Sequence, residues 1–276
     1  MAIAGGINIT QSESNDGDKV VVHGIDISGN SEVTLSGHST VDTTTIFGGH
    51  VVLAQINNGG SLILDDNSVI DITAKYISSK YYTQNALLMA SGESSSIENK
   101  GNITSQGVYS IMRASNGAKI GNSGDILVYT TGNNGSDDRT GIVQASGNGS
   151  VVHNQSGGDI TVISDQTPQS TGGYAIYPLM WYTHTFYAMA SSGYGSVTND
   201  KDATIHIQGA GVYGVAASRG TALNEGEIYL DGFVPTLDDE NNITSTGYWH
   251  PSSLYLTSSG MVAGSTDSGN GDATAT

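Results

Sequence analysis

The stretch ASNGAKIGNSGDILV, residues 114–128, decides how this chain folds. It reads as three short strands: one runs into Ala114-Ser115, a second ends at Asn122, and a third alternates around Ile126. Successive side chains of a strand point to opposite faces, so this alternation places one side chain inside and the next outside. A glycine follows each of the first two strands, which is typical of tight corners.

The same pattern occurs five times along the chain. An asparagine ends the second strand of each copy: Asn99, Asn122, Asn154, Asn199 and Asn224. The steps between these asparagines are 23, 32, 45 and 25 residues, which indicates a unit of about 23 residues that accepts insertions. We therefore predict an all-β fold, a right-handed parallel β-helix with three-strand rungs.

Weaker copies precede these five, for example at residues 31–41 and 61–73. Counting them gives about ten or eleven rungs and a rod on the order of 50 Å long. A β-propeller is the alternative fold, but it needs repeats of roughly 40–50 residues with hairpin turns. The shortest repeats here are about half that length, which favours the β-helix.

Equivalent positions of successive rungs should stack in columns. The five asparagines are expected to form a ladder of amide hydrogen bonds along the solenoid. One isoleucine from each third strand is expected in a single interior column: Ile103, Ile126, Ile160, Ile205 and Ile228. The glycines at both corners of the rung are expected to adopt positive φ.

Composition and charge exclude several classes of protein. The net charge of −17 comes from 26 acidic and 9 basic residues, and the bases are scattered. Such a chain repels phosphate, so it is not expected to bind nucleic acid. Apolar runs stay well short of the roughly 20 residues that span a bilayer, so membrane insertion is not expected either. Cysteine is absent, so disulfides do not stabilise the fold.

The insertions between rungs suggest where function lies. They follow the third strand of successive rungs, in segments of very different length: 74–83, 105–107, 129–140, 164–185, 208–211 and 231–253. The same point of every rung lies on the same edge of a solenoid, so these loops should share one side. Variable insertions in repeat proteins commonly form the binding face.

Aromatic and charged side chains are concentrated in these loops. We predict a ligand site with six aromatic anchors, since aromatic rings stack on sugars and anchor protein interfaces: Tyr174, Tyr177, Trp181, Tyr182, Tyr248 and Trp249. Three polar partners complete the prediction: Asp138, Arg139 and Asp239. The alternative is that the aromatic side chains only fill space between a loop and the flank of the helix.

The acidic clusters in the loops have two interpretations. Paired carboxylates such as Asp137-Asp138 could perform glycoside hydrolysis. We favour solvated loop charge or a weak Ca²⁺ site. No catalytic residue, no defined metal site and no cofactor is predicted, and the chain is expected not to be an enzyme.

The repeat Ile-x-Asn-x-Gly-x-Ile-x-Val, seen at Ile97–Thr104 and Ile120–Val128, resembles passenger domains of type V autotransporters, the AIDA-type and pertactin-like adhesins. The resemblance covers roughly Ser31 to Leu230. It implies export across a bacterial outer membrane and display at the cell surface. The signal peptide and the C-terminal barrel of the family are not found, so the chain is expected to be a passenger fragment.

These observations lead to one functional expectation with two alternatives. The chain is expected to be a surface adhesin that binds a host glycan, glycosaminoglycan included, or a matrix protein such as fibronectin. The alternatives are a polysaccharide lyase or hydrolase, and an adhesin that binds copies of itself in aggregation and biofilm. Residues 1–257 are expected to form one β-helix domain, followed by a tail or truncated rung over 258–276.

Overall fold

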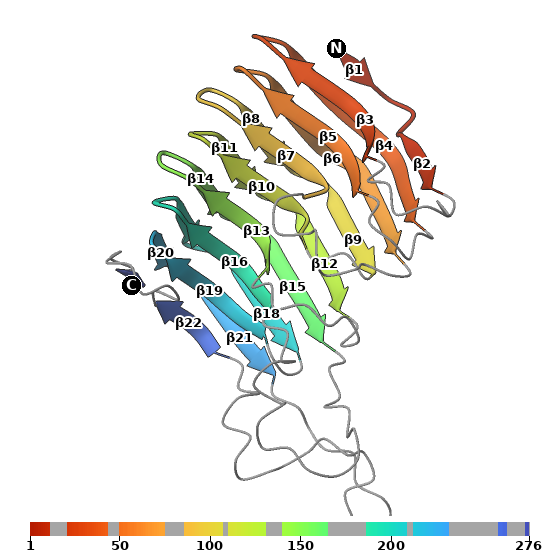
Figure 1. Ribbon diagram of the computed structural model, residues 1–276. Coiled ribbons are helices and arrows are strands. Elements are labelled where there is room, and N and C mark those ends of the chain that lie inside the picture. The colour runs from red at the N-terminus through yellow and green to blue at the C-terminus, as the bar shows by residue number, and fades with distance from the viewer. Residues whose placement is uncertain are drawn as a thin grey trace, which may run out of the picture.

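The computed structural model describes residues 1–11, 21–43, 50–74, 86–106, 110–130, 140–164, 186–208, 212–231, 259–263 and 274–275. Throughout these ranges the secondary structure consists of β-strands, and every pair of neighbouring strands is parallel. The strands wind into rungs that stack from the N-terminus to the C-terminus (Figure 1). The predicted parallel β-helix is thus confirmed.

Three faces surround the interior. The first-face strands form one sheet: β3 (Val21–Ser28), β5 (His50–Asn57), β7 (Leu88–Ser91), β10 (Met112–Ser115), β13 (Thr140–Ser146), β16 (Phe186–Ser192), β19 (Val212–Ser218) and β22 (Ser259–Ala263). The second face holds β8 (Ser96–Asn99), β11 (Lys119–Asn122), β14 (Val151–Asn154), β17 (Ser196–Asn199), β20 (Thr221–Asn224) and β23 (Thr274–Ala275). The third face holds β9 (Asn102–Gln106), β12 (Asp125–Thr130), β15 (Asp159–Ser164), β18 (Thr204–Gln208) and β21 (Glu227–Asp231).

The N-terminal rungs differ from the repeat. There, β4 (Glu32–Thr43) and β6 (Ser61–Ala74) each run through the second and third faces as one long strand. The first rung is partial, since β1 (Ala2–Ile3) and β2 (Asn8–Gln11) both pair with β4. The strands of the described residues make nine rungs, where ten or eleven were predicted for the chain.

The interior isoleucine column forms as predicted. Ile103, Ile126, Ile160, Ile205 and Ile228 follow one another in register along the third face. The first four are at most 1% exposed, and each such burial stabilises the fold by roughly 1.5–3 kcal/mol. Ile228 is only partly buried, since no described strand covers the outer side of β21.

The asparagine ladder is also present. Asn99, Asn122, Asn154 and Asn199 are fully buried, and each Nδ2 donates to Oδ1 of the next asparagine, the last bond ending on Asn224. The four donor–acceptor distances are 2.7, 2.8, 2.8 and 2.8 Å. Leu64 occupies the ladder position of the preceding rung, and so Asn99 Oδ1 is buried without a donor.

The two corners use glycine for different reasons, which corrects the sequence-based expectation. At the first corner, glycines such as Gly117 do adopt positive φ, here 88°. At the second corner, Gly101, Gly124, Gly158 and Gly226 are absent from the positive-φ region. A Cβ at Gly124 would instead overlap the carbonyl oxygen of Gly101 on the preceding rung. At these four positions the second corner therefore selects glycine for close stacking of the backbone, whereas Gly157 at the same corner does have a positive φ, of 85°.

Candidate binding edge

The C-terminal ends of the third strands stack into one edge of the solenoid. Gln106, Tyr129, Ile163 and Gln208 are in register there, on β9, β12, β15 and β18. From this edge the chain continues to the next first strand through segments of unequal length: 75–87, 107–111, 131–139, 165–185, 209–211 and 232–258. We call the row of strand ends the insertion edge. Its existence agrees with the predicted common origin of the loops.

One long connection does not start at this edge. Segment 264–273 lies between β22 and β23, at the corner that joins the first and second faces. Other connections at this corner are only a few residues long, as between β10 and β11. The expectation that a single corner accepts insertions is therefore wrong for the last rung.

All nine predicted ligand residues lie outside the described residues. They fall in segments that depart from the insertion edge: Asp138, Arg139, Tyr174, Tyr177, Trp181, Tyr182, Asp239, Tyr248 and Trp249. The acidic cluster Asp137-Asp138, considered for Ca²⁺, lies there as well. Their roles in binding stay predictions, while the strand ends that flank these segments are described.

The described surface beside the insertion edge is itself aromatic in part. Tyr129, at the edge, is 38% exposed, and Tyr229 on β21 is 50% exposed. Tyr229 packs edge-to-face against His206, with ring centroids 6.0 Å apart and an interplanar angle of 66°. Its hydroxyl donates to the Glu227 carboxylate, and this hydrogen bond, together with the charge of Glu227, raises the pKa of Tyr229.

Sequence reasoning did not select Tyr229 or His206 as a pair. Tyr229 follows Ile228 in the two-residue alternation, so its outward direction could be read from the sequence. The contact with His206 depends on the register of β18 and β21, which aligns these two residues directly. Aligning the five repeats residue by residue would have found it.

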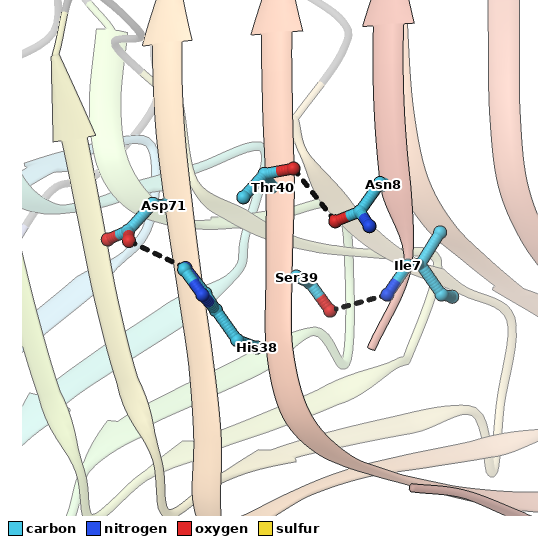
Figure 2. A network of polar contacts seen from close by, with 6 residues as sticks. All are labelled: Ile7, Asn8, His38, Ser39, Thr40 and Asp71. Atoms are coloured by element: carbon cyan, nitrogen blue, oxygen red, sulfur yellow. Dashed lines mark hydrogen bonds and ion pairs between the residues drawn. The ribbon is translucent and has the colours of Figure 1, made fainter. Parts of the chain in front are cut away.

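Toward the N-terminus the outward side of the third face is polar. His38 Nε2 lies 2.8 Å from Asp71 Oδ2, and Thr40 Oγ1 donates to Asn8 Oδ1 at 2.8 Å; both contacts are drawn in Figure 2. The side chains of His38 and Asp71 are 58% and 49% exposed. An ion pair so exposed contributes little to stability, typically below about 1 kcal/mol. These groups present donors and acceptors on a flat sheet surface.

The second face carries another small polar group. Gly121 has no side chain, and the side chains of Glu98 and Gln155 approach each other in the space above it. Burial raises the pKa of Glu98, while the positive charge of Lys100 and the hydrogen bond from Gln155 partly oppose this. His153 Nδ1 lies 2.8 Å from Asp200 Oδ1 at the adjoining corner.

These groups do not combine into a metal centre. No cluster of three or more His, Asp or Glu side chains suited to a metal ion occurs among the residues that the structure describes. Within the same residues, no helix is long and apolar enough to cross a membrane.

Both a family model and a known bacterial protein match the sequence of this chain. A family model, described as the BigA third pectate lyase-like domain, matches residues 52–276. A protein of Salmonella typhimurium strain LT2, named "Putative surface-exposed virulence protein BigA", is 70% identical over 274 residues. The match covers 99% of this chain and 14% of that protein, so the chain spans about a seventh of the relative's length. No solved structure matches the chain.

Proposed function

This chain belongs to the family of the BigA third pectate lyase-like domain, and on that premise we propose that it is an adhesive segment of a bacterial surface protein. The relative's name describes a surface-exposed virulence protein, which supports display at the cell surface. Display as the passenger of a type V autotransporter is part of the proposal. The repeat that resembles such passengers supports it.

The insertion edge is the observation that carries the proposal. A regular solenoid holds the ends of β9, β12, β15, β18 and β21 in a fixed row. The rigid scaffold lets the connecting segments differ in length and composition without disturbing the fold. Two of those segments contain both tryptophans of the chain, Trp181 and Trp249.

We propose a host glycan or an extracellular matrix protein as the ligand. Aromatic rings in the insertions would stack on sugar rings or enter pockets of a protein partner. The net charge of −17 opposes direct capture of a polyanion. A sulfated glycan would therefore bind through amide and aromatic groups, or through bridging cations.

We also propose that the chain binds its ligand without transforming it. The family description contains the word lyase-like, and a lyase needs charged groups that stabilise the enolate of a uronate. In the described part of the surface, His38–Asp71 and His153–Asp200 each pair one carboxylate with a histidine, and Asp125 lies in register with Asp159 on the neighbouring strand. The relative's name describes a virulence protein and no enzyme, which favours recognition over catalysis.

The test is a binding array of glycans and matrix proteins, probed with the purified chain. Trp181→Ala and Trp249→Ala should each weaken binding by about 5- to 150-fold, as expected for interface anchors worth about 1–3 kcal/mol. Tyr194→Ala is the matched control, since Tyr194 is 67% exposed at the first corner. This control should bind as the parent does.

Three outcomes would contradict the proposal. The first is unaltered binding in both tryptophan variants accompanied by a lower melting temperature, since the rings then only fill space. The second is the release of new unsaturated or reducing ends from pectin, chondroitin or heparin, which would indicate an enzyme. The third is aggregation of cells that display the chain with no binding on the array, which would indicate adhesion between copies.

A further inference from the structure

Within the described residues, three Asn-Gly steps lie at the first corner, which joins the first and second faces. They are Asn58-Gly59, Asn116-Gly117 and Asn148-Gly149, and all three asparagines are exposed. An asparagine before glycine is chemically labile, because glycine has no Cβ to hinder attack of its backbone nitrogen on the asparagine side chain. Two further steps, Asn134-Gly135 and Asn270-Gly271, lie outside the described residues. The three described steps share one sequence, so a difference in their reactivity has to come from the structure.

At the first two steps, a serine of the next rung binds the backbone nitrogen that would attack. Gly59 N donates to Ser95 Oγ at 3.1 Å. Gly117 N donates in the same way to Ser150 Oγ, also at 3.1 Å. Both serines are at most 1% exposed, and the hydroxyl of each donates to the carbonyl four residues before it at 2.8 Å. An N–H that is covered and hydrogen-bonded loses its proton to solvent slowly, which protects the asparagine before it.

The corners that supply these serines are one residue longer than the corners that they protect. The longer corners are residues 92–95 and 147–150, and the shorter ones are residues 58–60 and 116–118. The last residue of each longer corner is the buried serine, whose hydroxyl reaches the rung before. A longer corner therefore protects the shorter corner that precedes it.

Asn148-Gly149 lies in a longer corner and is not protected in this way. In the next rung, residues 193–195 separate β16 from β17, so the corner is again a short one. Gly195 stands directly before β17, at the place where a longer corner has its serine, and it has no hydroxyl. Among the described residues, Gly149 N has no hydrogen-bond partner, and Gly149 is exposed. The attacking nitrogen is therefore open to solvent at this step alone of the three.

We propose that Asn148 is a site of spontaneous deamidation, while Asn58 and Asn116 persist as asparagine. Gly149 N loses its proton to solvent and attacks Cγ of Asn148. A bond forms between this nitrogen and Cγ, the bond from Cγ to Nδ2 breaks, and Nδ2 takes a proton from water and leaves as ammonia. Water then opens the resulting succinimide at either of its carbonyl carbons, which gives aspartate or isoaspartate. Overall, the reaction consumes one water and releases one ammonia.

The consequences of the reaction stay local to the first corner. Each conversion adds one negative charge to a chain whose net charge is already −17. Isoaspartate also lengthens the main chain by one carbon atom, in a corner that already has one residue more than residues 116–118. The first corner is not the insertion edge, so the proposal does not depend on the ligand proposed above.

Peptide mapping by mass spectrometry tests the proposal on the purified chain. The folded chain is kept at neutral pH and body temperature, and samples taken at intervals are digested. Conversion should be at least about tenfold faster at Asn148 than at Asn58 or Asn116. It should also become faster as pH rises, because the attacking nitrogen has to lose its proton. In a sample unfolded by denaturant the three rates should be similar, since the hydrogen bonds to serine are then absent.

Two serine variants form a crossed pair of controls, after circular dichroism has shown that each keeps the fold. Ser95→Ala frees the nitrogen that follows Asn58 and should accelerate conversion at Asn58 but not at Asn116. Ser150→Ala should have the opposite effect, with faster conversion at Asn116 and no change at Asn58. Acceleration at both asparagines in either variant, or at neither, would overturn the assignment of protection to the serines.

The parent chain alone can also overturn the proposal. Equal conversion at the three asparagines in the folded chain would do so, because the corners would then not control reactivity. Conversion at Asn148 that is far slower in the folded chain than in denaturant would do so as well, since the corner would then protect this step too.

Discussion

Replacing Asn122 by alanine should destabilise the fold by about 3–5 kcal/mol. Asn122 is fully buried in the middle of the ladder. It donates to Asn154 Oδ1 at 2.8 Å and to the Gly124 carbonyl at 3.0 Å, and it accepts from Asn99 at 2.7 Å. A single lost hydrogen bond would cost about 1 kcal/mol, but Asn122 makes three.

The magnitude follows from these three bonds. A hydrogen bond contributes about 1 kcal/mol net, and a buried polar group left without a partner costs about 1–3 kcal/mol. Alanine at position 122 removes three bonds and leaves Asn154 Oδ1 without its donor from the preceding rung. Two of the bonds cost about 1 kcal/mol each, and the loss of the third, which orphans Asn154 Oδ1, costs about 1–3 kcal/mol, so the total is about 3–5 kcal/mol.

Asn99→Ala is the matched control, because Asn99 begins the ladder. Its Oδ1 has no donor, so only the two bonds made by its Nδ2 are lost. We expect this variant to cost about 1–2 kcal/mol less than Asn122→Ala. Denaturant unfolding followed by circular dichroism measures both, provided that the slope m is unchanged. Equal costs for the two variants would refute the account of the ladder.

Four further substitutions test the rest of the fold. Ile126→Asp places an unpaired charge in the interior column and should cost several kcal/mol, or prevent folding, in the same denaturation assay. Gly124→Ala should cost about 1–3 kcal/mol by overpacking against the preceding rung. Gly157 has open space around it but a φ of 85°, so Gly157→Ala should cost only backbone strain, about 1 kcal/mol. A larger loss of stability in Gly157→Ala than in Gly124→Ala would contradict this explanation. Burial is the chief cause that raises the pKa of Glu98 in the folded chain. The free energy of unfolding therefore falls as pH rises from the ordinary carboxyl pKa through this raised pKa. Glu98→Gln should therefore be slightly more stable than the parent near pH 7, by about 0.5 kcal/mol or less, with no such gain in melts at about pH 3.

The features that the sequence revealed are those that every rung repeats. Asn122 and Ile126 recur at fixed positions in each copy, so their columns could be predicted from the repeat alone. Because the rungs stack at a constant spacing, equivalent residues of successive rungs become neighbours. These contacts therefore follow from the repeat itself. The N-terminal region was harder, because Leu64 stands in the ladder column and no glycine marks the second corner of β6.

The error about the second corner has a physical cause. Gly124 lacks positive φ because the tightness of the second corner comes from rung-to-rung contact, which a single rung does not reveal. Ala203 occupies the equivalent position two rungs on and is fully buried, so the corner can accommodate one methyl group there. The candidate ligand residues lie in insertions that do not repeat. The stacking of rungs predicts that these insertions begin at the insertion edge, but it does not predict their conformation.

The central claim, that the insertions bind ligand while the solenoid only displays them, can be tested by exchanging connections. Gly209-Ala210-Gly211 joins β18 to β19, which are equivalent to the strand pairs flanking 165–185 and 232–258. Replacing both long segments with this tripeptide should keep the circular dichroism spectrum of the β-helix.

Dissociation constants for the strongest ligand on the array, measured for parent and exchanged chains, decide the matter. We predict a loss of at least 100-fold when both segments are replaced, and no change when 209–211 is replaced by three serines. Retention of full affinity by a folded, exchanged chain would contradict the claim, because the ligand would then bind outside the two segments that contain the aromatic anchors.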